Sequence, residues 1–304
     1  AGCSGAADGS AGFESGYGAF FTLNDWANRV AGENAEFEDP VDVGQLGHGW
    51  TPDGTLAADV AATDAFVYLD SPEFSWAQDL AATLESDYDT VATVDVLAGL
   101  EGDLLEWNHA HGEESHDDET HDGENHGNET HEGENHDDET RYDPHVWTDP
   151  VLAGEMVDTI ATGLGEADPD NAEAYAANAD SYVEELGAID DAFRSIADDA
   201  ARDVAVLAGH NSFQYLEERY GFRLRSPVGV SPQNEPTQSE IADTIDLVDS
   251  EGIDVVLYDR FQSPRLAESI VDNSGATEAV PVSPAGGTTR EWNDAGYGYL
   301  EQMT

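Results

Sequence analysis

The sequence predicts an α/β fold of two lobes, each with a mainly parallel sheet, joined by one long rigid α-helix. Three observations support this expectation. Short apolar runs alternate with longer amphipathic segments, which is typical of layered α/β folds. The apolar runs form two groups, one before and one after a strongly polar tract. One amphipathic segment between the groups is long enough to reach from one lobe to the other.

Seven short apolar runs are the strand candidates, four before the polar tract and three after it. They are GAFFTL at 18–23, PVDVGQL at 40–46, DAFVYL at 64–69, TVATVDV at 90–96, DVAVLA at 203–208, DVVLYD at 254–259 and AVPV at 279–282. From their grouping we expect an N-terminal lobe over residues 18–167 and a C-terminal lobe over residues 203–304.

Residues 168–202 are expected to form the linking helix. Asp168 suits the N-cap and Pro169 the first helical position. An apolar stripe then follows one face of the helix, spaced by seven, four, three, four and three residues: Tyr175, Tyr182, Leu186, Ile189, Phe193 and Ile196. Such a helix is about 45 Å long at about 1.5 Å per residue. A second helix is predicted just upstream, opened by Asp149 and Pro150.

The charge of the chain is extreme. Its 304 residues include 39% hydrophobic side chains, but 66 acidic residues face 10 basic ones, all of them arginine, for a net charge of −56. Such a chain repels itself unless concentrated salt screens it, with a Debye length of about 3 Å at 1 M. The composition therefore indicates a high-salt organism. It argues against nucleic acid and anionic membrane surfaces as partners, because both are polyanions.

The first residues read AGCSGAADGSAG, with Cys3 after two small residues. This pattern is similar to the end of a lipoprotein signal, so residues 1–17 are expected to be a lipoprotein tether with lipid on Cys3. The alternative is a chance cysteine in a flexible terminus. Because Cys3 is the single cysteine, it excludes an internal disulfide and a cysteine-built metal site. No apolar run reaches about 18 residues, so no segment is expected to span a bilayer.

Residues 111–140 read HGEESHDDETHDGENHGNETHEGENHDDET, without one apolar side chain. A five-residue period turns successive imidazoles to different faces of a helix and alternate sides of a strand, so the tract cannot present them as one array. With nothing to bury, residues 108–140 are expected to be a disordered loop. Imidazoles bind zinc, copper and nickel, so we interpret the tract as a weak metal collector. Its histidines are His109, His111, His116, His121, His126, His131 and His136.

Three further histidines, His48, His145 and His210, stand apart in LGHGWTPDG, DPHVWTDP and AGHNSFQYLEERYG. His48 follows the candidate strand at 40–46 and His210 follows the one at 203–208. Open α/β sheets place their ligands at the carboxyl ends of strands. Each histidine alone is typical of a hydrogen-bonded loop residue. Together, in a chain with a metal-collecting tract, they predict a metal site.

These segments, in this order, resemble the substrate-binding lipoproteins of zinc and manganese ABC importers over nearly the whole chain from residue 18. The resemblance rests on an early histidine-aromatic-proline loop, a DPHxW motif, a third histidine ahead of an aromatic and a YG pair, and a later EP turn. In this sequence these are His48, Trp50 and Pro52; Asp143, Pro144, His145 and Trp147; His210, Phe213, Tyr220 and Gly221; and Glu235 and Pro236.

The resemblance implies two α/β lobes joined by a long helix, with the metal held in the cleft between them by His48, His145 and His210. Zinc-type members often carry a histidine-rich acidic loop between the first two ligands, where this tract lies. The implied function is capture of Zn²⁺ outside the membrane and delivery to the permease of an ABC importer. The implied form is a monomer held by lipid on Cys3 at the outer face of the cell membrane.

The chain departs from the family pattern in two places. Gly47 precedes His48 where proline is usual, and Pro284 and Ala285 lie where manganese-type members supply a carboxylate. Asp259 and Glu291 are close in sequence, but nothing in the sequence brings either into the cleft. Three imidazoles with a water or chloride complete a zinc tetrahedron, whereas Mn²⁺ prefers oxygen ligands. Zn²⁺ is therefore the expected cargo and Mn²⁺ the less favoured one. Acid should release it, because imidazole protonates near pH 6.5.

Three alternatives remain open at this stage: a manganese-type protein of the same family, a zinc-dependent hydrolase, and a metal-buffering surface protein in which the tract does all the binding. A hydrolase also uses three histidines and an open water position. The chain, however, has no HExxH helix and no histidine, serine or cysteine as an obvious base or nucleophile. We therefore expect no catalytic role.

Overall fold

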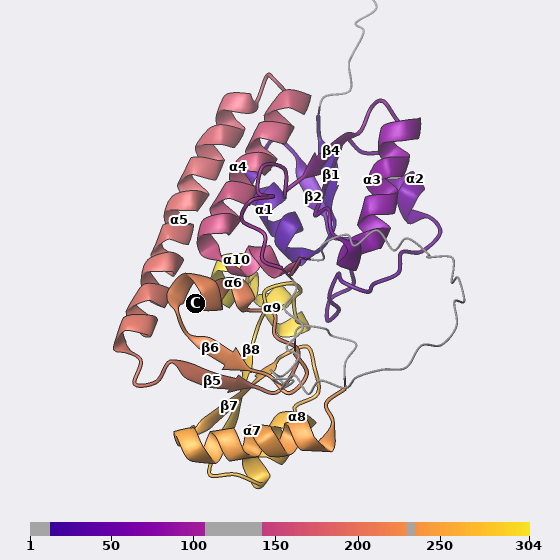
Figure 1. The fold of residues 1–304 in the computed structure, drawn as a ribbon. Coiled ribbons are helices and arrows are strands. Elements are labelled where there is room, and N and C mark those ends of the chain that lie inside the picture. The colour runs from indigo at the N-terminus through magenta and orange to yellow at the C-terminus, as the bar shows by residue number, and fades with distance from the viewer. Residues whose placement is uncertain (1–12, 107–141, 230–234) are drawn as a thin grey trace, which may run out of the picture.

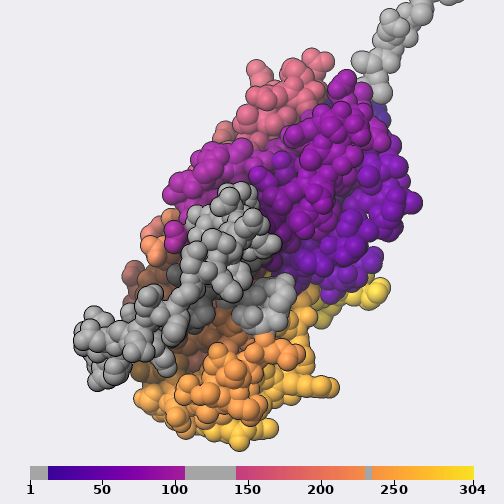
Figure 2. Space-filling model, turned by 45° about the vertical axis from the view of Figure 1, so that its right-hand side comes forward, coloured from indigo at the N-terminus to yellow at the C-terminus, as the bar shows by residue number. Residues whose placement is uncertain are grey.

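A computed structural model describes residues 13–106, 142–229 and 235–304. These residues form two α/β lobes, with the N-terminal lobe in indigo and purple and most of the C-terminal lobe in orange and yellow (Figure 1, Figure 2). Each lobe has a four-stranded sheet, ordered β2-β1-β3-β4 and β6-β5-β7-β8, in which every neighbouring pair runs parallel. The predicted fold of two lobes with parallel sheets is confirmed.

The strands are β1 Ser15–Gly18, β2 Glu36–Glu38, β3 Ala65–Tyr68, β4 Ala92–Asp95, β5 Val204–Leu207, β6 Arg223–Arg225, β7 Val255–Asp259 and β8 Glu278–Val282. The α-helices are α1 Phe21–Ala31, α2 Leu56–Val60, α3 Ser75–Asp87, α4 Pro150–Ala167, α5 Ala172–Asp199, α6 Gln214–Tyr220, α7 Gln238–Glu251, α8 Arg265–Asp272, α9 Arg290–Ala295 and α10 Tyr299–Met303. Two short 3₁₀ helices, η1 Pro72–Phe74 and η2 His145–Thr148, precede α3 and α4. No helix of the described residues is both long and apolar enough to cross a membrane.

The first strand ends earlier than the sequence suggested. The run at 18–23 is not a strand: β1 ends at Gly18 and α1 begins at Phe21. The chain turns so tightly there that a Cβ on Gly18 would lie 2.4 Å from the backbone nitrogen of Asn24. Phe20 and Leu23 are fully buried, so a short helix start buried all round gave the same apolar run as a strand. Because β1 begins at Ser15, the folded lobe also starts inside the segment predicted as tether.

The second predicted strand is also wrong, because β2 is Glu36–Glu38 and residues 40–46 form a loop. Pro40 offers no N–H to a sheet. The N–H of Val41 donates to Asp39 Oδ1 at 2.8 Å, and that of Gly44 donates to the Thr288 carbonyl at 2.8 Å. The backbone N–H groups of Val41 and Gly44 therefore bond to a side chain and to a distant segment of the chain, and not to a neighbouring strand.

The long linking helix exists, with a later start. Asp149 caps α4 as predicted, accepting from the N–H groups of Val151 and Leu152. Helix α4 then continues to Ala167, and Asp168 ends it instead of opening the next helix. Helix α5 follows as 28 unbroken residues, about 42 Å at about 1.5 Å per residue. Its apolar stripe is buried from Tyr175 to Ile189, whereas Ile196 is 65% exposed.

The C-terminal lobe agrees with three predicted strands, at 203–208, 254–259 and 279–282, and has one that was missed. That strand, β6, is an edge strand of three residues whose two arginines are exposed, so it lacks an apolar signal. Helices α7 and α8 bury one apolar cluster of this lobe. The last helix of the chain packs on the other lobe, because Tyr299 of α10 lies fully buried in the N-terminal core against Trp26.

The expected tether through residue 12 with Cys3, and the predicted loop at 108–140 with its seven histidines, lie outside the described residues.

The return of α10 to the N-terminal lobe gives a stability prediction. The Tyr299 hydroxyl donates to the Trp147 carbonyl at 2.5 Å, between two residues at most 1% exposed. Tyr299→Phe should lower the free energy of unfolding by about 1–3 kcal/mol, because the buried carbonyl loses that donor. Urea unfolding in molar salt measures the change. Tyr297→Phe, at a position 44% exposed, is the matched control and should change nothing. Equal stabilities for the two variants would contradict the assigned contact.

Candidate metal centre

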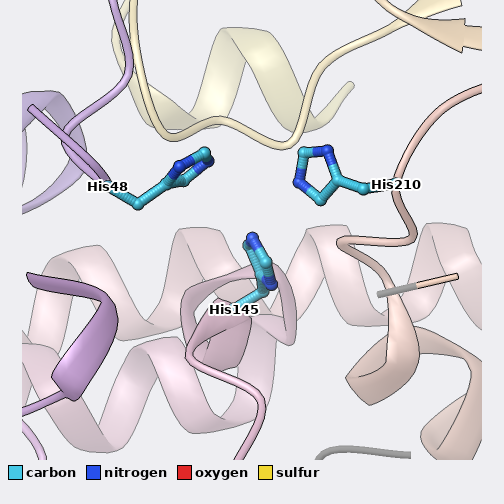
Figure 3. Close-up of side chains that lie close together, drawn as sticks. All are labelled: His48, His145 and His210. Carbon is cyan, nitrogen blue, oxygen red and sulfur yellow. The ribbon is translucent and has the colours of Figure 1, made fainter. Parts of the chain in front are cut away.

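Three imidazoles meet between the lobes (Figure 3). His48 lies in the loop between β2 and α2, His145 opens η2, and His210 comes three residues after β5. The ring centroids are 6.0 Å apart for His48 and His145, 5.6 Å for His48 and His210, and 5.5 Å for His145 and His210. One ligand nitrogen from each lies within 4.8 Å of the others. The three isolated histidines of the sequence thus form one group with the geometry for a single metal ion.

The loop that carries His48 is held by aromatic residues of the N-terminal lobe. Trp76 Nε1 donates to the Gly47 carbonyl at 3.1 Å, and the Trp76 ring contacts Trp50 with centroids 4.8 Å apart. A Cβ on residue 47 would lie 2.7 Å from Phe20 Cβ and 3.0 Å from the Phe74 ring. Glycine at this position, where the family resemblance led us to expect proline, is therefore required by the close approach of the loop to Phe20.

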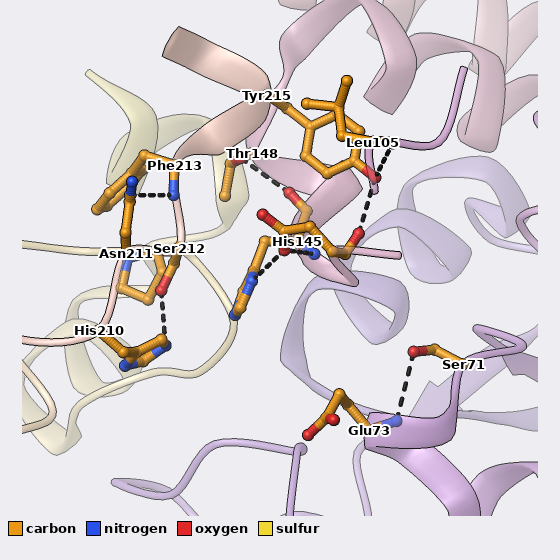
Figure 4. A network of polar contacts seen from close by, with 12 residues as sticks. Ser71, Glu73, Leu105, His145, Thr148, His210, Asn211, Ser212, Phe213 and Tyr215 are labelled. Atoms are coloured by element: carbon orange, nitrogen blue, oxygen red, sulfur yellow. Dashed lines mark hydrogen bonds and ion pairs between the residues drawn. The ribbon is translucent and has the colours of Figure 1, made fainter. Parts of the chain in front are cut away.

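His145 lies in a network of polar contacts (Figure 4) and is fixed by the aspartate of its own motif. Asp143 Oδ1 lies 2.6 Å from His145 Nδ1 and also accepts from the His145 backbone N–H at 3.0 Å. A carboxylate at Nδ1 favours the tautomer with the proton on that nitrogen, which leaves the Nε2 lone pair free. His145 Nε2 is buried and has no hydrogen-bond partner among the described residues. This nitrogen can therefore serve as a metal ligand, because its electron pair is uncommitted.

His210 has a polar partner at each ring nitrogen. Ser212 Oγ lies 2.8 Å from Nε2, and Gln262 Nε2 lies 2.8 Å from Nδ1. Gln262 also contacts Asp259 Oδ2 at 3.4 Å. The structure therefore places Asp259, which the sequence could not position, at the carboxyl end of β7 beside the histidine group. Glu291, the other carboxylate in question, is exposed on α9.

Burial favours the neutral form of two of the three imidazoles, His48 and His210. His145 and His210 are at most 2% exposed, and His48 is partly buried. Burial, and then the neighbouring His145, lower the pKa of His48 to about 4. Burial, then the neighbouring His145 and His48, hold the pKa of His210 far below its ordinary value. Because neutral imidazole is the form that coordinates metal, His48 and His210 remain able to bind an ion well below pH 6.5.

The C-terminal segment lies against the same site. Trp147 Nε1 donates to the Pro284 carbonyl at 2.7 Å, and Thr22 Oγ1 donates to the Ala285 carbonyl. Ala285 is fully buried and has a φ of 54°, a conformation that costs a non-glycine residue about 1 kcal/mol or more. The turn provides no carboxylate, so the described residues offer three nitrogen ligands and leave a fourth position for water or an anion.

Helix α6 connects the second lobe to the His145 motif. The Tyr215 hydroxyl donates to the Asp143 carbonyl at 2.7 Å and accepts from the Leu105 N–H at 3.1 Å. Arg219 pairs with Asp149, the cap of α4. Sequence reasoning missed these contacts and the roles of Gln262 and Ser212. Of these supporting residues, only Asp143 was indicated by the sequence, as part of the DPHxW motif.

Two α/β lobes, each with a parallel sheet, and a buried histidine group at their junction define a two-lobed solute-binding protein. The chain belongs to the ZnuA family, described as the periplasmic component A of the zinc-uptake complex, whose family model matches residues 18–304. The family comprises substrate-binding components of uptake systems.

Curated relatives support the same family. The zinc-binding lipoprotein AdcA of Streptococcus pneumoniae serotype 4 is 28% identical over 286 residues, which cover 93% of this chain and 52% of AdcA. The high-affinity zinc uptake system protein ZnuA of Bacillus subtilis is 27% identical over 284 residues, covering 93% of this chain and 82% of that protein. The chain thus spans about half the length of the streptococcal relatives it matches.

Solved structures share the fold. The Zn(II)-bound ZnuA-like domain of S. pneumoniae AdcA superposes with a TM-score of 0.72 at 25% identity, covering 96% of this chain and 95% of that domain. The laminin-binding adhesin Lmb of Streptococcus agalactiae has a TM-score of 0.76 at 23% identity, with 96% of both chains covered.

The position of the His48 loop can be tested at Gly47. Gly47→Ala should weaken metal binding and lower the free energy of unfolding by about 1–3 kcal/mol, because the new methyl group clashes with Phe20 and displaces the loop. Isothermal calorimetry and urea unfolding measure the two effects. Gly54→Ala, in the same loop but with open space around the added carbon, is the control. Unchanged binding and stability in Gly47→Ala would show that the loop tolerates the methyl group.

Proposed function

We propose that this chain is an extracytoplasmic solute-binding protein that captures Zn²⁺ and delivers it to an ABC import permease, with His48, His145 and His210 as the ligands. The observation that supports this most strongly is the buried Nε2 of His145, which has no hydrogen-bond partner among the described residues and belongs to a group with two further imidazoles. The zinc-binding names of the relatives and the zinc-bound AdcA domain point to the same cargo.

The ligand set favours zinc over manganese. Zn²⁺ accepts three imidazoles and one water or chloride at Zn–N distances of about 2.0–2.1 Å without a geometric penalty. Mn²⁺ binds nitrogen sites most weakly in the first-row series. His48 and His145 come from the N-terminal lobe, and His210 comes from the C-terminal lobe. A displacement of one lobe by the permease would therefore remove a ligand from the ion and release it.

The proposal extends to the setting of the protein. We place it at the outer face of the cell membrane of a halophile, as a monomer anchored by lipid on Cys3. The acidic, lysine-free composition is suited to concentrated salt. The histidine tract would raise the local concentration of zinc near the site.

The central test is a metal titration of a variant that lacks residues 109–140. Glu106 and Tyr142 form an antiparallel bridge, so the three residues left between them can close a short hairpin loop. Calorimetry in molar salt should find one tight Zn²⁺ site that outcompetes Mn²⁺. Replacement of any one of the three histidines by alanine should weaken Zn²⁺ binding by a larger factor than the roughly 10–100-fold that is typical of an outer-shell change. No tight site would move the binding into the tract, and a preference for Mn²⁺ would mean that a carboxylate completes the ligand set.

Metal release by acid has a defined window. An ordinary imidazole pKa of about 6.5 predicts loss of affinity between pH 7 and pH 5. The lowered pKa values of His48 and His210 move that loss toward pH 4, because protons compete for these nitrogens only in stronger acid. Competition titrations of the same deletion variant from pH 8 to pH 3.5 should therefore stay nearly level to about pH 5 and fall below it. A midpoint near pH 6.5 would contradict the lowered pKa values of His48 and His210.

A further inference from the structure

Two buried carboxylates flank the histidine group. Asp143 is 0% exposed and Asp259 is 2% exposed. In the part of the chain that the structure describes, no arginine forms an ion pair with either of them. A buried carboxylate without a cationic partner is costly, so its retention beside a cation site suggests a function.

The two carboxylates reach the imidazoles in different ways. Asp143 contacts His145 Nδ1 directly at 2.6 Å. Asp259 is one residue further removed, because the Gln262 side chain lies between it and His210. The amide nitrogen of Gln262 is 3.4 Å from Asp259 Oδ2 and 2.8 Å from His210 Nδ1. Each of these two histidines thus has a carboxylate behind its Nδ1, one in direct contact and one through an amide.

The charges of this arrangement balance when a divalent cation is bound. Three neutral imidazoles contribute no charge, and Asp143 and Asp259 contribute two negative charges. A dication therefore makes the buried group neutral, whereas without the cation two negative charges remain buried and no arginine among the described residues pairs with them. Metal-ligating histidines commonly donate their second N–H to such a carboxylate or carbonyl, which orients the ring.

We propose that Asp259 is a positioning residue for His210, acting through Gln262, and that it supplies half of the negative charge that balances the bound dication. The inference rests on the proposed zinc function. When His210 Nε2 coordinates the ion, Nδ1 carries the proton and needs an acceptor. In the structure the Gln262 amide nitrogen faces both Nδ1 and Asp259 Oδ2, so on metal binding the side chain has to reorient, accepting from that N–H with its oxygen and donating its own N–H to Asp259. In Figure 3, one ring nitrogen of His210 points toward the other two rings, as this arrangement requires.

A purely structural role for Asp259 makes a different prediction. Asp259 Oδ1 also accepts from the Phe261 N–H at 2.9 Å and so shapes the turn after β7. Asparagine keeps that acceptor and the side-chain volume, and it removes the charge together with Oδ2, the acceptor that faces Gln262. Asp259→Asn therefore separates charge balance from the geometry of the turn.

The test compares the full chain with Asp259→Asn and with Asp254→Asn, an exposed carboxylate just before the same strand that makes the same charge change. The tightest Zn²⁺ site is measured by competition with a chromophoric chelator, with His48→Ala reporting the background of the tract. Asp259→Asn should bind Zn²⁺ about 10–100-fold more weakly, as expected for an outer-shell partner. The melting temperature of its metal-free form should be equal to or above that of wild type. Asp254→Asn should match wild type in both measurements.

Gln262→Leu provides the second arm. It should weaken binding by a similar factor, and the double variant with Asp259→Asn should lose little beyond either single change, because both act through one relay. Wild-type affinity in Asp259→Asn would overturn the inference. So would a metal-free melting temperature that falls along with the affinity, or wild-type affinity in Gln262→Leu. If the wild-type chain itself has no tight zinc site, the proposed function fails instead.

Discussion

The whole site depends on the contact of the C-terminal segment with the N-terminal lobe. After its second sheet the chain turns back, and the carbonyls of Pro284 and Ala285 accept hydrogen bonds from Trp147 and Thr22. The Thr288 carbonyl accepts from Gly44 in the loop that carries His48. Helix α10 then buries Tyr299 in the N-terminal core. These contacts, together with α5 and α6, hold loops from both lobes close enough for the three imidazoles to meet.

That geometry carries an energetic cost in the metal-free state. The site buries imidazole nitrogens and carboxylate oxygens without full hydrogen bonding: His145 Nε2 and Asp143 Oδ2 both lack a partner among the described residues. Ala285 adds a strained backbone in the adjoining turn. A bound dication would satisfy the free nitrogen and offset the buried negative charge. Affinity for the ion and the instability of the empty site thus have the same physical origin.

The sequence was sufficient for the parts governed by local chemistry. The cap formed by Asp149 and Pro150 gave the start of α4, and the apolar stripe from Tyr175 gave α5. The three isolated histidines were singled out because they stand in loops, two of them after predicted strands. Together with the histidine tract they predicted a metal site, and the family resemblance implied that they act as one ligand set in the cleft.

Other features could not be predicted because they depend on tertiary contact. Phe20 belongs to a short helix start buried all round, which has the same pattern as a strand. Residues 40–46 bond to a segment more than 200 residues away, and no local pattern encodes that. Asp168 has the chemistry of an N-cap, but α4 continues to it and uses it as an end. The placement of Asp259 behind Gln262 likewise follows from how the turn after β7 packs against His210.

The most direct test of the account is X-ray absorption at the zinc edge on the chain lacking residues 109–140, loaded with one equivalent of Zn²⁺. We expect three nitrogen ligands at about 2.0–2.1 Å, a fourth ligand that is water or chloride, and the outer-shell scattering of three imidazoles. Scattering from one imidazole or none would mean that His48, His145 and His210, although they lie together, do not jointly hold the ion.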